Sequence, residues 1–353
     1  MNKTSYIFIL ALALLYACGD SREVTNSPSS PRVKKTTKME SPGQNDTFSR
    51  GTLIPFSFSS SGAKIDSVVV AVDGNTSTYL SSSFDFDLPG RKVGTWSLRT
   101  KVYCGDQSET HFRKVIVLPE TPPIEMTYTV INTYPHDTKD YTQGLLILDG
   151  LLYESTGQRG ASTFKQKDLT TGETIKVVNL SDELFGEGLA FLGDEFYQLT
   201  WTSGKGFVYN REMEEVRTFS YPMQGWGLTT YGEQLILTDE SEKLYFIEPS
   251  SFTVQKEIEV YDHEGKIDSL NELEMIDGKL WANIFLTDDI VIIEPETGEV
   301  LQRIDFSGLL TAEEAARADV LNGIAVDPET GKIYVTGKDW PKLFEVTIQA
   351  KTI

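Results

Sequence analysis

Five short segments in the second half of the chain place a polar or aromatic residue two positions before a leucine or isoleucine. They are Gln143-Gly144-Leu145, Glu187-Gly188-Leu189, Trp226-Gly227-Leu228, Asn271-Glu272-Leu273 and Asn322-Gly323-Ile324. A carboxyl group can transfer protons, and amide and aromatic side chains can orient a small polar substrate. This chemistry requires that the fold bring residues 39 to 51 positions apart to one place.

A second set of side chains follows these segments at a regular distance. Counting on from each leading residue gives Gly157, Trp201, Asp239 or Glu240, Phe285 and, after a longer turn, Lys338. If each segment begins one strand and the second set ends the next antiparallel strand, both sets meet at one edge of the sheet. We therefore expect Glu187, Asn271 and Lys338 to share one rim, with Trp201 and Trp226 beside them.

The spacing of the segments predicts the fold that positions these residues. Repeats of about 40–50 residues that each contain several short strands are typical of a β-propeller. Residues 124–353 contain five such repeats. The last repeat ends after three strands, at 342–348, and Thr127–Asn132 supplies a spare strand that would close the ring. We therefore predict an all-β, five-bladed β-propeller, with one helical excursion over Thr311–Asp319.

The residues before the propeller divide into three parts. Residues 1–17 have the short apolar run of a signal peptide, and Cys18 after a small residue resembles the lipidated cysteine of bacterial lipoproteins. An ordinary secretory signal with a chance cysteine is the alternative. Residues 18–50 are polar and predict a disordered tether. Residues 51–119 alternate as antiparallel strands do, which predicts a small immunoglobulin-like β-sandwich.

Composition excludes several functions. The net charge of −20 disfavours nucleic acid and anionic lipid surfaces as partners, so we expect membrane attachment by the lipid only. Removal of the signal leaves Cys104 without a partner for an intramolecular disulfide if Cys18 is lipidated. The three histidines, His111, His136 and His263, are far apart, so we expect no zinc or iron site built from His and Cys.

The candidate site residues also have purely structural alternatives. Glu187 and Lys338 could form an ion pair of the kind common in structural networks. Asn271 could cap a loop. The aromatic residues Trp201, Trp226 and Phe285 could pack between blades instead of forming the walls of a binding site.

Seven motifs in the propeller region together resemble the plant-type glutaminyl-peptide cyclotransferases, also called glutaminyl cyclases. They are Tyr134-Pro135-His136-Asp137, Tyr141-Thr142-Gln143-Gly144-Leu145, Phe185-Gly186-Glu187-Gly188-Leu189, Gly225-Trp226-Gly227-Leu228, Leu270-Asn271-Glu272-Leu273-Glu274, Trp281-Ala282-Asn283 and Val335-Thr336-Gly337-Lys338. The resemblance implies a zinc-independent, five-bladed propeller. It also implies an aminoacyltransferase that converts the N-terminal glutamine of a peptide to pyroglutamate and releases ammonia.

The resemblance also assigns roles to residues. It implies that Glu187, Asn271 and Lys338 are catalytic. It implies that the substrate-binding residues are Gln143, Tyr141, Phe185, Trp201, Trp226 and Phe285. Two positions depart from the family pattern, because Tyr141 stands where a phenylalanine is common and Phe285 replaces a pocket tryptophan.

Two other functions remain open at this stage. One is a non-catalytic, lipid-anchored propeller that binds peptides or other small ligands, and the other is a metal-dependent propeller hydrolase such as a lactonase. For the enzyme we expect no cofactor, although a structural calcium ion in the channel is compatible with it. We expect a monomer in the bacterial cell envelope, anchored on the periplasmic or outer-membrane side.

Overall fold

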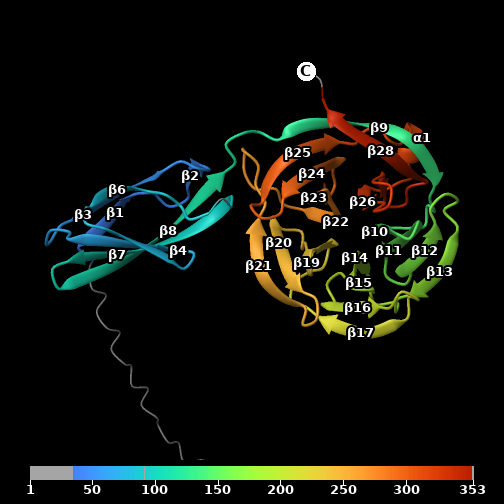
Figure 1. The fold of residues 1–353 in the computed structure, drawn as a ribbon, viewed down its shortest axis with the longest axis horizontal. Helices are drawn as coiled ribbons and strands as arrows, with labels where there is room; N and C mark the ends of the chain where they lie inside the picture. The colour runs from blue at the N-terminus through green and yellow to red at the C-terminus, as the bar shows by residue number, and fades with distance from the viewer. Residues whose placement is uncertain (1–34, 91, 352–353) are drawn as a thin grey trace, which may run out of the picture. The chain divides into compact units, whose positions relative to one another are not determined.

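The computed structural model describes residues 35–90 and 92–351, which form an all-β fold with one short helix (Figure 1). The predicted signal peptide, the lipidation site Cys18 and most of the predicted tether lie outside the described residues. Within residues 35–90 and 92–351, no helix is long and apolar enough to span a membrane.

The first eight strands form two sheets that share one apolar core. One sheet contains β1 (Thr37–Ser41), β3 (Ile54–Ser60) and β6 (Ser83–Phe86). The other contains, in spatial order, β2 (Asp46–Ser49), β8 (Gln107–Leu118), β7 (Gly94–Cys104), β4 (Ser67–Val72) and β5 (Asn75–Tyr79). Alternate side chains point into the core, as Phe56 from one sheet and Trp96 from the other illustrate. The alternation of apolar and polar residues in the sequence therefore predicted the sandwich, because every second side chain of a strand faces the core.

The predicted tether extends too far toward the C-terminus. The predicted tether over residues 18–50 includes residues 37–41 and 46–49, but these form the strands β1 and β2. Both strands are short and largely polar, so their composition resembles that of a linker. In β1 only Thr37 and Met39 face inward, and pairing with β3 supplies the backbone hydrogen bonds. The sandwich therefore begins before residue 51.

The following strands form a β-propeller, in which sheets are arranged as a ring (Figure 1). The first sheet contains β10 (Thr142–Leu148), β11 (Leu151–Thr156), β12 (Thr163–Asp168) and β13 (Thr174–Asn179). The second contains β14 (Gly186–Leu192), β15 (Glu195–Thr200), β16 (Lys205–Tyr209) and β17 (Glu215–Ser220). The third contains β18 (Leu228–Tyr231), β19 (Gln234–Leu237), β20 (Lys243–Glu248) and β21 (Thr253–Glu259). In each, the first strand lies toward the centre of the ring.

One eight-stranded sheet completes the ring. Its spatial order is β22 (Leu270–Ile276), β23 (Lys279–Ile284), β24 (Asp289–Glu294), β25 (Glu299–Asp305), β9 (Ile124–Pro135), β28 (Lys342–Ala350), β27 (Ile333–Gly337) and β26 (Leu321–Val326). The strand β9 pairs antiparallel with β28 along most of its length and parallel with β25 at its start. This pairing confirms that the spare strand before the first repeat joins the last one, so no sheet edge is left open there.

Glycine follows the leading residue in four of the five repeated segments: Gly144, Gly188 and Gly227 lie where the inner strands approach one another closely, and Gly323 has a positive φ of 128°. A Cβ atom on Gly227 would lie 2.0 Å from the backbone oxygen of Asn271, and one on Gly188 would lie 2.5 Å from the nitrogen of Leu228. No side chain fits at these distances. The glycines therefore allow the leading residues to converge around the centre of the ring.

In the fourth repeat Glu272 occupies the glycine position and reaches across the channel. A bulge in β22 turns its side chain inward, where Oε1 accepts a hydrogen bond from the Leu145 amide (3.2 Å) and Oε2 accepts one from the Ile324 amide (2.8 Å). One buried carboxyl group therefore links three inner strands.

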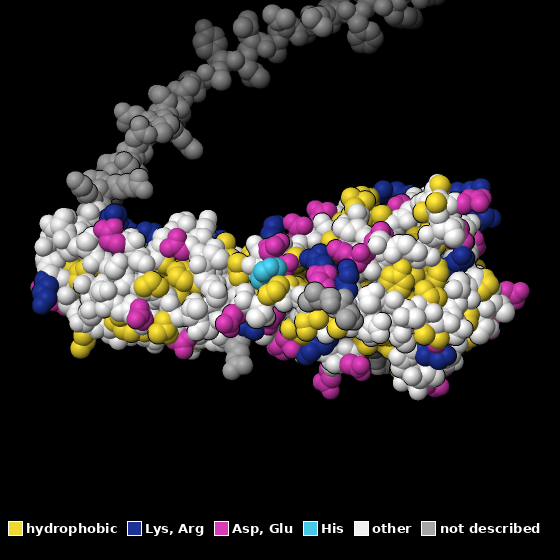
Figure 2. Space-filling model, turned by 90° about the horizontal axis from the view of Figure 1, so that it is seen from above, with side chains coloured by type: hydrophobic (Ala, Val, Ile, Leu, Met, Phe, Trp, Pro, Cys, Tyr) yellow, Lys and Arg dark blue, Asp and Glu magenta, His cyan; other side chains and the backbone are white. Residues whose placement is uncertain are grey.

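The predicted helical excursion is shorter than expected. Only α1 (Ala312–Ala315) is helical, with Thr311 and Glu314 forming a capping box at its start. A helix this short is marginal because few backbone bonds repay its nucleation. On the face shown in Figure 2, acidic and basic side chains are scattered among hydrophobic and other side chains.

Candidate active site

The side chains predicted for the site surround one cavity of about 580 Å³. Its lining contains the nine predicted residues together with three more: Tyr141, Gln143, Phe185, Glu187, Trp201, Trp226, Glu240, Asp268, Ser269, Asn271, Phe285 and Lys338. Glu240 was one of two candidates at its position. Asp268 and Ser269 were not predicted, since they lie in a loop before an inner strand, outside the repeated spacing. The structure thus places the predicted residues together, while their chemical roles stay predictions.

A repeated backbone turn aims the second set of residues at the cavity. In four repeats a residue two or three positions after the second strand has a positive φ: Gln158 (83°), Glu240 (75°), Leu286 (67°) and Asp339 (59°). Residues other than glycine adopt this conformation at a cost of order 1–3 kcal/mol, so the surrounding structure must enforce it. Phe285 and Lys338 directly precede two of these turns and line the cavity.

Glu187 is a buried carboxyl group with one oxygen left free. Its side chain is 3% exposed, Oε1 accepts a hydrogen bond from Gln143 Nε2 (2.8 Å), and Oε2 has no hydrogen-bond partner. Burial raises the pKa of Glu187 well above its ordinary value, and this outweighs the opposing effects of the Lys338 charge and the Gln143 bond. Such a group keeps its proton to a higher pH than an exposed carboxyl group does, which suits it to both accepting and donating a proton.

Two hydrogen bonds of the Asn322 side chain fix the orientation of the Gln143 side-chain amide. Asn322 Nδ2 donates to the backbone oxygen of Thr142 (2.9 Å), which can only accept, and also to Gln143 Oε1 (3.0 Å). The Gln143 amide must therefore turn its nitrogen toward Glu187. Asn322 is the leading residue of the fifth repeated segment, but it is fully buried and does not line the cavity.

Lys338 is a desolvated cation between two aromatic rings. It is 2% exposed, and its Nζ lies 4.9 Å from the centre of the Tyr141 ring and 4.8 Å from that of Phe285. Burial lowers its pKa, and the nearby Glu187 charge opposes this shift. The ring faces favour the ammonium form. Since Glu187 is hydrogen-bonded only to Gln143, the direct ion pair considered from the sequence does not form.

The aromatic residues form walls whose faces stay open to the cavity. Tyr141, Phe185, Trp201, Trp226 and Phe285 are each partly exposed, which differs from the full burial expected of packing between blades. Edge-to-face contacts join Phe185 to Trp201 (5.7 Å between ring centres) and Trp226 to Phe285 (5.3 Å). These contacts make the walls rigid.

Other neighbours give the walls their shape. Gly157, at the position where other repeats place a wall residue, leaves room for the Phe185 ring, which a Cβ there would meet at 2.3 Å. The Tyr141 hydroxyl donates to Asp319 (3.0 Å) at the end of the helical excursion. The excursion therefore supports the rim, a role that composition could not distinguish from that of a surface helix.

Asn271 points a polar group into the cavity without satisfying it. The residue is 3% exposed, and its side-chain Oδ1 has no hydrogen-bond partner. Its backbone oxygen, by contrast, accepts a bond from the Thr238 hydroxyl (3.0 Å), which holds the strand in place. A loop cap would use the side-chain oxygen, so the arrangement favours a ligand-facing amide over a cap.

Three side chains elsewhere among the described residues have ligand atoms close enough to hold a metal ion. The atoms of His136, Asp140 and Glu154 lie within 4.8 Å of one another. The ammonium of Lys167 already binds both carboxylates, so a positive charge is supplied there by the chain itself.

The ring of sheets defines a β-propeller. Its aromatic cavity, lined also by a buried carboxyl, an amide and a lysine, defines a site for a small molecule or a peptide. The chain matches the family model described as glutamine cyclotransferase over residues 104–348, and it belongs to this family. The glutaminyl-peptide cyclotransferase of Arabidopsis thaliana is 37% identical over 227 residues, which cover 62% of this chain and 71% of that protein.

A solved structure agrees with this assignment. The glutaminyl cyclase of Myxococcus xanthus is 37% identical and superimposes with a TM-score of 0.60. The match covers 65% of this chain and the whole of the Myxococcus chain.

Proposed function

We propose that the protein is a glutaminyl-peptide cyclotransferase, which converts the N-terminal glutamine of peptides or proteins to pyroglutamate and releases ammonia. The observation that carries the proposal is the buried Glu187 carboxyl, whose free oxygen lies in the same cavity as Asn271 and Lys338. Membership of the glutamine cyclotransferase family and the two relatives support it.

Glu187 has the features of a single proton carrier for both halves of the reaction. The neutral α-amine attacks the γ-carboxamide carbon and forms the ring C–N bond, while Glu187 takes a proton from the amine nitrogen. The same carboxyl then gives this proton to the amide nitrogen as its bond to the carbon breaks, and ammonia leaves. The raised pKa of Glu187 suits it to both steps near neutral pH.

Lys338 and Asn271 would stabilise the charge that forms on the γ-oxygen. Attack on the carboxamide makes an oxyanion, and donors fixed in a dry site stabilise it strongly. Lys338 carries its charge between two rings, and Asn271 is fixed on the inner strand β22. Gln143 holds Glu187 in place, and the rings of Phe185, Trp201 and Trp226 would bend the glutamine side chain toward the amine.

The finer architecture is also a proposal. We count five blades, because the eight-stranded sheet divides at β9 into two arrays of four strands that each resemble the other three sheets. We also assign the sandwich to the immunoglobulin-like type, since two antiparallel-rich sheets enclose one core.

The remaining expectations concern location and cofactors. We propose that lipidation of Cys18 anchors the protein in the bacterial cell envelope, on the periplasmic or outer-membrane side, and that the protein is a monomer. Catalysis would need no metal, while a calcium ion could have a structural role in the channel. Peptides with N-terminal glutamine are the proposed partners, and the acidic surface disfavours nucleic acid.

The test measures ammonia and pyroglutamate together from a glutamine-initiated dipeptide amide in the presence of EDTA. We expect turnover by the wild-type protein and a loss of about 10²–10⁴-fold in Glu187→Gln, with the melting temperature unchanged or raised. A folded wild-type protein that releases no ammonia would contradict the proposal and favour a peptide-binding role. Activity lost in EDTA and restored by a metal would favour the hydrolase alternative.

A further inference from the structure

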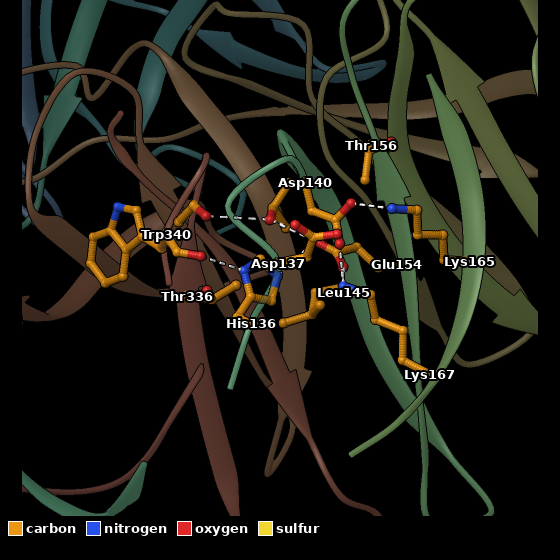
Figure 3. Close-up of polar contacts among 12 residues, drawn as sticks. His136, Asp137, Asp140, Leu145, Glu154, Thr156, Lys165, Lys167, Thr336 and Trp340 are labelled. Atoms are coloured by element: carbon orange, nitrogen blue, oxygen red, sulfur yellow. Dashed lines mark hydrogen bonds and ion pairs between the residues drawn. The ribbon is translucent and has the colours of Figure 1, made fainter. Parts of the chain in front are cut away.

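The turn that carries Lys338 is held by the segment between β9 and β10, which contains His136 and Asp140 (Figure 3). The turn lies between β27 and β28. His136 Nδ1 contacts the backbone oxygen of Trp340 (2.8 Å), and the His136 amide donates to the oxygen of Pro341 (3.0 Å). The Asp339 amide donates to the backbone oxygen of Asp140 (2.9 Å). Three contacts therefore fix the backbone of residues 339–341, which directly follow Lys338.

The His136 ring is doubly protonated in this arrangement. The Trp340 oxygen can only accept a hydrogen bond, so Nδ1 carries a proton, and Nε2 lies 3.0 Å from Glu154 Oε1. Burial, the largest single influence, lowers the pKa of His136, but the Glu154 charge and the hydrogen bonds to Glu154 and Trp340 together raise it above its ordinary value. An imidazolium that donates from both nitrogens results.

Glu154 connects this histidine to the strand that carries Gln143. Besides His136, its carboxylate accepts a hydrogen bond from the Thr142 hydroxyl (2.7 Å), and Lys167 Nζ binds its other oxygen (2.7 Å). Thr142 directly precedes Gln143, which in turn binds Glu187. The buried Glu154 thus ties the Lys338 turn to the strand that orients the proposed proton carrier.

The carboxylates of Glu154 and Asp140 are paired with cationic side chains of the chain itself. Lys167 and Lys165 both bind Asp140, and Lys167 also binds Glu154. All except Lys165 are buried, and Lys165 is only slightly exposed. Removal of one partner from such a network leaves an uncompensated buried charge. The geometry of the network therefore has little freedom.

We propose that His136 is a positioning residue, which restrains the turn that carries Lys338 for the cyclisation, while Glu154 holds the His136 ring. This inference rests on the proposed function for its catalytic consequence. Its structural part, the restraint of the Lys338 turn, rests only on the contacts described above. A displacement of a reacting group by about 1 Å can cost 10²-fold in rate.

Two amide substitutions of His136 separate positioning from general stability. In His136→Asn the amide nitrogen replaces Nδ1 and can still donate to Trp340, whereas in His136→Gln it replaces Nε2 and can still donate to Glu154. Both variants lose the positive charge and one hydrogen bond, so both lose stability. We expect His136→Gln to lower kcat by about tenfold or more with KM changed little, and His136→Asn to keep most of kcat.

Hydrogen exchange of the turn gives a readout that does not depend on activity. The amides of residues 338–340 should exchange faster in His136→Gln than in His136→Asn at equal global stability. Equal exchange and equal kcat in the two variants would overturn the proposal and leave a purely structural role. If the wild-type protein shows no turnover, the proposed function fails, but the exchange experiment still decides whether His136 restrains the turn.

Discussion

Among the described residues Gln143 alone donates a hydrogen bond to the Glu187 carboxyl, so the pKa of this carboxyl depends on one neighbouring amide. Burial raises the pKa, and the Gln143 bond and the Lys338 charge each lower it. A catalytic base must be deprotonated in the free enzyme. The acid limb of kcat/KM should therefore report the Glu187 pKa.

Replacement of Gln143 by leucine tests this dependence. Without the hydrogen bond the pKa of Glu187 rises further, so the acid limb of kcat/KM should move to higher pH than in the wild-type protein. In the wild-type protein this acid limb should already lie at a higher pH than the range of ordinary carboxyl pKa values. Measurement of kcat/KM from pH 4.5 to 9 on a glutamine-initiated dipeptide amide checks both. A limb that does not move in Gln143→Leu would mean that another group controls it.

Phe285 is the clearest departure from the family pattern, and the structure gives it two contacts. It packs edge-to-face on Trp226, and its ring lies 4.8 Å from Lys338 Nζ. Cation–π contacts of desolvated ammonium groups are worth about 2 kcal/mol and are strongest with tryptophan. The phenylalanine therefore does not remove the aromatic partner of Lys338.

We expect Phe285→Trp to keep or improve kcat/KM, and Phe285→Leu to lower it by about tenfold, because only the leucine lacks a ring face for the ammonium. Steady-state kinetics of both variants provide the measurement. Wild-type kinetics in Phe285→Leu would show that the ring does not contribute to the Lys338 environment.

At the residue scale, the sequence could predict the side chains that recur with the repeat. Trp201 follows Glu187 by 14 positions, Phe285 follows Asn271 by the same 14 positions, and all four residues line the cavity. Asp268 and Ser269 could not be found in this way, because they lie in a loop whose path depends on the rest of the ring. The inward direction of the Glu272 side chain could not be predicted either, because a bulge breaks the alternation of side chains along its strand.

At the element scale, the inner strands depend on glycines with no room for a side chain. We expect Gly227→Ala to destabilise the protein by about 1–3 kcal/mol or more, because its Cβ would lie 2.0 Å from the Asn271 oxygen. It should also lower activity, since Asn271 must move. Urea unfolding and kcat measure the two effects.

Gly265 provides a matched control for this substitution. A Cβ atom added there meets nothing within 4 Å, so Gly265→Ala should change the free energy of unfolding by only a few tenths of a kcal/mol. Equal effects of the two substitutions would contradict the steric explanation.

The elements that the sequence predicted well are those with strong local patterns. Alternating apolar residues identified β7 and β8, and the spare strand near Thr127 was found because one repeat had three strands instead of four. The strands β1 and β2 were missed because they are polar. Their stability comes from pairing with distant strands, which a local pattern does not record.

At the scale of the whole molecule, several buried groups bind protons more tightly in the folded state. Burial raises the pKa values of Glu187 and Glu272 well above the ordinary value, and raises that of Glu274 to about 8. Glu154 raises that of His136 despite burial. Each group is more protonated in the folded than in the unfolded chain between its two pKa values. Their stabilising effect is therefore present at low pH and lost as pH rises.

We therefore expect the free energy of unfolding to decrease from pH 5 to pH 8, measured by urea unfolding at several pH values. One unit of difference in pKa corresponds to about 1.4 kcal/mol.

The net charge of −20 acts in the same direction through repulsion between surface carboxylates. Salt separates the two effects, because about 0.5 M salt screens exposed charges much more than buried ones. The slope should persist in salt and should become smaller in Glu187→Gln, which cannot bind the proton. A stability that rises toward pH 8, or a slope abolished by salt, would show that the buried carboxyl groups do not control it.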